Sequence, residues 1–231
     1  MKGYALLTSM FIFFFDALAG TDTLIVKQTS DFSVNGRGTH SNWEHATWVP
    51  LKQLDDYTAD YSTRFKIMYS ARGVYVLFEG LDHKVTTTYS KDFDNLFNAD
   101  VFEVFFHTDT SIPLYFEYEV NALDKELVLF IPHFKSGVGG WIPWHYEGER
   151  KVQKKVFIYD TNGKMEKWSA EMFFPFGLLS PLGNVPAAKG TYWNANFYRL
   201  DYDGGKMVKF AWSPVDKSFH EYKRYGTIKF E

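Results

Sequence analysis

The sequence predicts one all-β domain, an antiparallel β-sandwich of the jelly-roll type. Phe, Tyr and Trp make up 19% of the chain, and aromatic residues favour strands. Alternating apolar and polar residues recur in short runs bounded by turn signals, and no long segment keeps a helical period. Roughly ten strands without intervening helices pack as antiparallel sheets. No linker-like stretch and no internal repeat divides the chain, so we expect a single domain.

The individual strands are placed by alternation between turn signals. The Asn162-Gly163 pair is the dipeptide most typical of a two-residue hairpin turn. Asp203-Gly204-Gly205 marks a second hairpin. In chain order, strands are expected at 63–69, 73–81, 100–107, 114–121, 126–132, 151–159, 167–174, 191–200, 206–212 and 227–231.

The first twenty residues, 1–20, have the features of a secretory signal peptide. Lys2 supplies a positive end, residues 4–15 form an apolar run, and Ala17-Leu18-Ala19 is a small-x-small cleavage site. The apolar run is short for a membrane span. A buried strand or an anchor helix is the alternative for this segment. We therefore expect an exported protein, secreted or periplasmic, whose domain occupies residues 21–231.

Composition narrows the classes of partner. The chain of 231 residues has a formal net charge of −3 and no cysteine. Disulfide bonds are thereby excluded, and so is a thiol-linked lipid next to the signal, so we expect no membrane attachment after cleavage. The absence of a basic patch or arginine run argues against nucleic acid as a partner. The composition leaves the oligomeric state open.

Polar residues recur on one face of several predicted strands. In the strand 114–121, Glu117, Glu119 and Asn121 alternate with apolar side chains, and residues two apart share a face. Carboxylates, amides and a guanidinium on one face suit a polyhydroxylated ligand, which needs donors and acceptors. The alternative is a solvated face on which an arginine neutralises Glu171 or Glu117. Further polar residues within predicted strands are Glu103, Glu171, Asn196 and Arg199.

The segment 137–149, GVGGWIPWHYEGE, places aromatic side chains in a stretch rich in glycine and broken by proline. Such a stretch is typical of a surface loop or sheet edge, and exposed rings there stack on the apolar face of a pyranose. The alternative is that one tryptophan closes the end of the sandwich. The polar connection 86–95 is expected at the same rim. The candidate sugar-binding residues are Trp141, Trp144, His145, Tyr89, Glu117, Asn121, Asn196 and Arg199.

Several segments resemble the carbohydrate-binding module family 9-like domains of exported bacterial proteins. The most specific are FEVFF (102–106), YFEYEVNAL (115–123) and WNANFYR (193–199), and their order and spacing extend over nearly the whole chain after the signal. The resemblance implies an antiparallel β-sandwich that binds sugars, often at a chain end held between aromatic rings. It also implies structural calcium, which some members hold.

The chain departs from this family pattern in two places. Phe97 stands where the family often has tryptophan, and Glu221-Tyr222 stands where it often has a Pro-Glu pair. The aromatic pair that grips the sugar varies between members, so Trp141 and Trp144 are predicted from exposure alone.

The oxygen donors for calcium would come from Asp82, Asp100 or the stretch 92–94. No spacing matches a helix–loop–helix calcium site. The segment 145–149 offers ligands for zinc or iron as an alternative.

The function expected from these features is non-catalytic binding of an oligosaccharide or polysaccharide, alone or within a polysaccharide-degrading assembly. A hydrolase or lyase that uses paired glutamates is the second hypothesis, although no catalytic motif accompanies them. Haem-based electron transfer through Met68 and a histidine is the third, and the Cys-x-x-Cys-His attachment motif is absent. The sequence leaves the identity of the sugar open.

Overall fold

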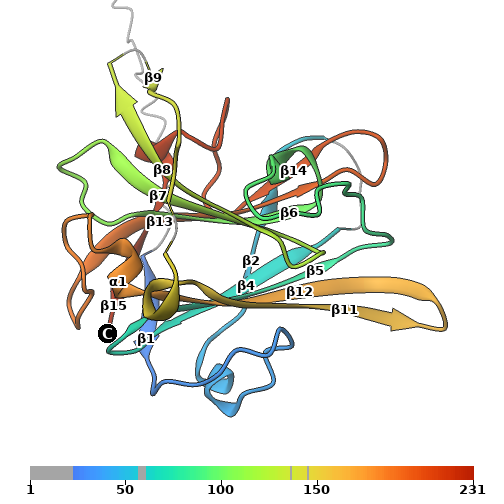
Figure 1. Cartoon of the computed structure of the whole chain (residues 1–231), viewed down its shortest axis with the longest axis horizontal. Helices are drawn as coiled ribbons and strands as arrows, with labels where there is room; N and C mark the ends of the chain where they lie inside the picture. Colours follow the sequence, from blue (N-terminus) through green and yellow to red (C-terminus); the bar gives the residue numbers. More distant parts are fainter. Residues whose placement is uncertain (1–22, 57–60, 136, 145) are drawn as a thin grey trace, which may run out of the picture.

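The structure is a computed structural model that describes residues 23–56, 61–135, 137–144 and 146–231, so the predicted signal peptide lies outside it. The described residues form two packed β-sheets (Figure 1), in agreement with the predicted sandwich. Eleven of their strands follow one hydrogen-bonded path, and β2, β3, β9 and β14 pair beside it. Within these residues, no helix has the length and apolar character needed to cross a membrane.

The first sheet carries the candidate site. Its main path runs β10-β8-β7-β6-β13-β15, with every neighbouring pair antiparallel. These strands are β6 (Val101–His107), β7 (Leu114–Asn121), β8 (Glu126–Phe134), β10 (Ile142–Pro143), β13 (Tyr192–Asp201) and β15 (Gly226–Phe230). Three shorter strands extend the sheet at its margins: β14 (Val208–Ala211), β3 (Lys52–Gln53) and β9 (Gly137–Val138).

The second sheet packs beneath the first in the view of Figure 1. It runs β1-β4-β5-β12-β11, and β2 pairs with β4. The strands are β1 (Leu24–Gln28), β2 (Val49–Pro50), β4 (Thr63–Tyr69), β5 (Gly73–Leu81), β11 (Gln153–Thr161) and β12 (Lys164–Pro175).

Strand β1 departs from the purely antiparallel arrangement that the sequence predicts. Its first residues pair in parallel with β15 of the first sheet, and its last two pair in parallel with β4 of the second. One strand thereby connects the edges of both layers.

The long strands lie close to their predicted bounds, and β4, β5 and β7 match them fully. The two-residue strands and the short helices were not predicted, because they are too short for alternation or a helical period to show. The helical segments are α1 (Phe176–Leu179) and the 3₁₀ turns η1 (Ser41–His45), η2 (Leu96–Asn98), η3 (Gly148–Arg150) and η4 (Tyr222–Arg224).

Stacked aromatic rings fill the space between the sheets. Phe102 stacks on Trp168 with ring centroids 3.8 Å apart, and Phe65 stacks on Phe197 at 3.9 Å. All four side chains are fully buried, and each buried ring of this size stabilises the fold by about 1.5–3 kcal/mol. The core therefore accounts for much of the high aromatic content.

The outer faces of the two sheets are covered differently. The second sheet is capped by the segment that contains η1, where Trp43 packs with Tyr75 and Phe173. Glu171 holds this cap by accepting hydrogen bonds from the backbone N–H of Gly36 and from Trp43 Nε1. The first sheet is covered by loops around η2 and η4 that leave an opening over its centre.

Candidate functional site

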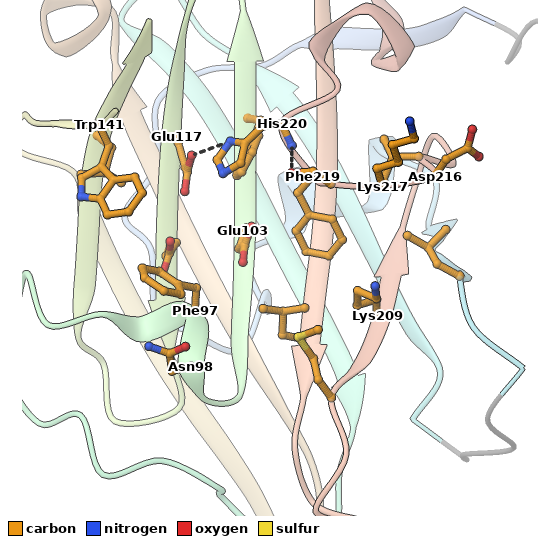
Figure 2. Close-up of a pocket in the computed structure, with 18 of the residues that line it drawn as sticks. Phe97, Asn98, Glu103, Glu117, Trp141, Lys209, Asp216, Lys217, Phe219 and His220 are labelled. Atoms are coloured by element: carbon orange, nitrogen blue, oxygen red, sulfur yellow. Dashed lines mark hydrogen bonds and ion pairs between the residues drawn. The ribbon is translucent and has the colours of Figure 1, made fainter. Parts of the chain in front are cut away.

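A pocket of about 350 Å³ opens on the outer face of the first sheet. Strands β6, β7 and β13 supply its floor. Its walls come from η2, from the segment before β10, and from the loops that flank β14. Figure 2 shows Trp141 and Phe97 on one side of the carboxyl groups and Phe219 and Lys209 on the other.

Three buried glutamates occupy the floor, and we call them the carboxyl floor: Glu103, Glu117 and Glu119. Glu103 lies directly opposite Glu119 across the β6–β7 ladder, and Glu117 is two residues before Glu119 on the same face. Their exposed fractions are 2%, 4% and 0% respectively. Neither carboxyl oxygen of Glu119 meets hydrogen-bond geometry with any described group, and the same holds for Oε2 of Glu117.

Burial makes the carboxyl floor reluctant to ionise. Desolvation raises the pKa of Glu117 to about 8. It raises the pKa of Glu103 well above its usual value, and the nearby Glu117 adds to this shift. The pKa of Glu119 is raised well above its usual value by burial and then by repulsion from the other two carboxyls, which outweigh the opposing Phe97 N–H. Glu117 is therefore mostly protonated at neutral pH, and burial disfavours ionisation of the other two carboxyl groups as well.

His220 is the ionisable base next to the floor. Its Nδ1 lies 3.7 Å from Glu117 Oε2 and 2.7 Å from the hydroxyl of Tyr115. Burial lowers the pKa of His220 to about 4, so the imidazole is neutral at pH 7 and supplies no counter-charge to the carboxyl group.

Two aromatic side chains from different segments meet at the mouth of the pocket. Trp141 is 55% exposed, and its ring centroid lies 6.2 Å from that of Phe97 at an interplanar angle of 62°. On the opposite wall, Phe219 stacks on Tyr198 at 4.0 Å. A flat ligand entering the pocket would contact apolar rings first and carboxyl groups below them.

The structure brings two of the predicted candidates, Trp141 and Glu117, into this pocket. Trp144 lies elsewhere: it stacks on Phe130 at 4.6 Å and donates from Nε1 to the Leu178 carbonyl. His145 is outside the described residues. Tyr89 packs partly buried against the apolar cluster on the outer face of the first sheet.

The two predicted amide candidates hold backbone segments in place. Asn121 donates to the Tyr89 carbonyl and accepts from the backbone N–H groups of Leu123 and Lys125, which shapes the β7–β8 turn. Asn196 is fully buried and exchanges two hydrogen bonds with the backbone of Ser213. Neither amide lines the pocket.

Arg199 points into the interior of the sandwich. Its Nη2 contacts Asp82 at 2.9 Å and Asp201 at 2.5 Å, with all three side chains fully buried. The pairing therefore involves these aspartates, whereas the sequence suggested Glu171 or Glu117. Glu171 lies in β12 of the other sheet, so it does not share a face with the carboxyl floor.

Asp82, Asp201 and Asp203 also form a site with metal-like geometry. One oxygen of each lies within 4.8 Å of the others. Oδ2 of Asp203 is buried and has no hydrogen-bond partner among the described groups. Oxygen donors of this kind suit calcium, and the three carboxyl groups outnumber the one guanidinium that contacts them. Asp82 was a predicted calcium donor.

Several pocket residues were not among the predicted candidates: Phe97, Asn98, Glu119, Lys209, Phe219 and His220. Alternation in β7 places Glu119 on the same face as Glu117, so Glu119 could have been predicted as a site residue from the sequence. In the sequence, Phe97 stands out only as a departure from the family pattern. His220 directly precedes the Glu221-Tyr222 departure from the family pattern, but alternation gives no sign that its loop folds back over the sheet.

Comparison with known proteins agrees with the sequence resemblance. The sequence model of the family described as carbohydrate family 9 binding domain-like matches residues 34–128. No curated protein matches the chain. The predicted resemblance to family 9-like domains is thus confirmed.

Solved structures share the fold. A protein from Bacteroides uniformis, described as a candidate carbohydrate-binding protein, matches with a TM-score of 0.72 at 19% identity, over 90% of this chain and 99% of its own. A family 9 carbohydrate-binding module from Caldicellulosiruptor kristjanssonii, solved with cellotriose, matches with a TM-score of 0.61 at 15% identity, over 90% of this chain and 93% of its own. The same module solved with glucose gives the same TM-score and identity.

Proposed function

We propose that this family 9-like β-sandwich binds an oligosaccharide or polysaccharide without transforming it, and that the sugar sits in the pocket above the carboxyl floor. The observation that carries the proposal is the juxtaposition of the exposed Trp141 ring and Phe97 with buried carboxyl groups below them. The proposal is supported by a module of the same fold that was solved in complex with cellotriose and with glucose.

The pocket offers the two kinds of contact that a sugar needs. The ring of Trp141 presents an apolar face against which the C–H groups of a pyranose can lie. A protonated carboxyl group both donates and accepts hydrogen bonds, so Glu103 and Glu117 serve hydroxyl groups of either polarity. The volume of about 350 Å³ falls at the lower end of small-molecule sites, which suits one or two sugar rings.

Isothermal titration calorimetry with a panel of mono- and oligosaccharides tests the proposal. We expect Trp141→Ala and Phe97→Ala each to weaken binding of the preferred sugar by about tenfold or more, the scale of one lost stacking contact. Phe134→Ala is the matched control, because Phe134 is 66% exposed and lies outside the pocket. Unchanged affinity in both pocket variants would refute this site.

Hydrolysis or lysis of a glycan is the second candidate function. Glu103 and Glu119 are direct cross-strand neighbours, and glycosidases use two facing carboxyl groups, one protonated as the acid and one ionised as the base or nucleophile. Release of reducing sugar from a polysaccharide panel, abolished by Glu117→Gln, would establish this activity in place of simple binding.

We also propose that Asp82, Asp201 and Asp203 hold a structural calcium ion. The buried, unpartnered Asp203 oxygen and the excess of carboxylates over Arg199 support it. When bound, the ion would accept about six to eight oxygen ligands and tie the end of β5 to the end of β13.

We propose export of the protein through cleavage of residues 1–20, which leaves the domain 21–231 outside the cytoplasm. The charged, apolar and small-residue regions of this segment support the proposal. Mass spectrometry of protein recovered from the exported fraction checks it: a mature chain that still begins at Met1 would contradict cleavage.

A further inference from the structure

The carboxyl floor has no cationic partner in the described part of the chain. Among Lys, Arg and His, only His220 comes within ion-pair distance of any of its three members, and that imidazole is neutral at pH 7. Lys209 and Lys217 line the walls without forming an ion pair with the floor. Buried carboxyl groups without a counter-charge are costly to ionise, so a cation delivered by a ligand would gain strongly there.

Unused acceptor positions face the same space. Glu119 is fully buried, and neither of its oxygens meets the geometry of a hydrogen bond to a described group, although the Phe97 N–H and the Glu117 carboxyl lie nearby. Glu117 Oε2 likewise lacks a hydrogen bond of good geometry, with His220 Nδ1 3.7 Å away. Native proteins rarely leave buried acceptors unsatisfied. These oxygens therefore mark the place where a ligand supplies hydrogen-bond donors.

A single metal ion fits this floor poorly. The described carboxylates whose oxygens converge within 4.8 Å of one another are Asp82, Asp201 and Asp203, on the other side of the sheet. The members of the carboxyl floor do not converge in this way. A ligand ammonium, which directs hydrogen bonds to separate oxygens, is the alternative cation.

We propose that the pocket selects saccharides that carry a free amino group, with the ammonium of a glucosamine-type residue placed on Glu119 and its neighbours. This inference rests on the proposed sugar-binding function and names its substrate class. An ammonium group offers three donors and a positive charge, and its hydrogen bonds to a carboxylate are about twice as strong as those of a neutral donor. An N-acetyl group at the same position has no charge and only one N–H. A hydroxyl group there has no charge and only one O–H donor.

The test compares glucose, N-acetylglucosamine and glucosamine oligomers of equal length and linkage, which differ only in the group at carbon 2. Calorimetry at pH 6 should give an affinity for the glucosamine oligomer at least about tenfold above the other two, the scale of one charge-assisted hydrogen bond. Equal affinities for the three sugars would overturn the inference and leave the proposed function standing. Absence of binding to every sugar would refute both.

Proton release gives a second readout of the same contact. Glu117 is largely protonated before binding, so an ammonium ligand that ionises it releases a proton, whereas a neutral sugar does not. Heats measured in buffers of different ionisation enthalpy report this difference, and identical proton counts for glucosamine and glucose would contradict it. The other ionisable groups that face the floor, and whose contribution the neutral sugars control for, are Tyr115, Tyr198, Tyr202, Lys209, Asp216, Lys217, His220 and Tyr225.

Substitution of a floor glutamate tests whether the carboxyl floor causes the preference for glucosamine oligomers. Glu119→Gln keeps the shape of the side chain and should lower the ratio of glucosamine to glucose affinity toward one. Glu166→Gln, an exposed change on β12 far from the pocket, should leave the ratio unchanged. Thermal melting of each variant checks folding, and Glu103→Gln replaces Glu119→Gln if the latter does not fold. A ratio that survives both floor variants would overturn the assignment.

Discussion

The buried ionisable groups of this protein are of two kinds, those that pair with one another and those that lack partners. Arg199 and its two aspartates satisfy one another inside the sandwich, whereas the carboxyl floor has unsatisfied acceptors beside a solvent-accessible pocket. The side chains of the Arg199 cluster and of the carboxyl floor are all buried. Pairing therefore distinguishes the structural cluster around Arg199 from the floor, for which we propose a binding role, where burial alone does not.

Removal of the Arg199 charge should destabilise the fold strongly. Arg199→Leu leaves Asp82 and Asp201 buried without their counter-charge, which costs about 3–5 kcal/mol of unfolding free energy. Arg64→Ala is the control, because the Arg64–Glu79 pair is half-exposed and such pairs contribute less than about 1 kcal/mol. Urea denaturation of both variants makes the comparison, and a similar small loss for each would show that the buried pair adds little.

The carboxyl floor predicts a stability that falls as pH rises. The folded-state pKa of Glu117, about 8, lies above the unfolded value, so the folded protein binds the extra proton and its stabilisation is lost as pH increases toward 8. His220 acts in the opposite direction, but only below its unfolded value of 6.5. Unfolding free energies measured between pH 6.5 and 8 should therefore decrease.

Glu117→Gln is the variant that checks this assignment. It should flatten the decrease between pH 6.5 and 8, because it removes one of the groups that titrate there. Stability that rises with pH in the wild-type protein would contradict the raised pKa values.

Among the elements, the β11–β12 hairpin shows how a sequence signal becomes backbone geometry. Asn162 and Gly163 adopt φ values of 56° and 78°, the left-handed pair that a two-residue hairpin turn requires. Gly163→Ala should cost about 1–2 kcal/mol through backbone strain alone, since a Cβ there meets no atom within 4 Å. Thermal melting measures the loss, with the exposed Lys164→Ala as control; equal melting temperatures would argue against strain.

The strands were predictable because their signals are local, and the site was predictable only in part. Alternation in β7 correctly placed Glu117 and Glu119 on one face. Arg199 shares its face with Trp193, which is a core residue, so its inward direction was also present in the pattern. Alternation cannot say which loops cover a face, and the walls at Phe97 and His220 depend on such loops.

For the whole molecule, calcium should raise stability if the aspartate site binds it. Free calcium at about 100 times its dissociation constant would add about 2.7 kcal/mol to the unfolding free energy. Thermal melting with added calcium and with a chelator measures the effect. Asp203→Asn should abolish the difference, and a melting temperature that calcium leaves unchanged in the wild-type protein would refute the site.

The position of β1 has a consequence for biosynthesis. Leu24 in β1 pairs with Ile228 in β15, more than two hundred residues later in the chain. The carboxyl terminus therefore lies beside β1 (Figure 1). Pairing of β1 with β15 must wait until the ribosome has released the final strand, whereas β4, the other neighbour of β1, is synthesised early. If the protein is exported as proposed, this late pairing leaves the two ends of the domain unjoined while the chain crosses the membrane.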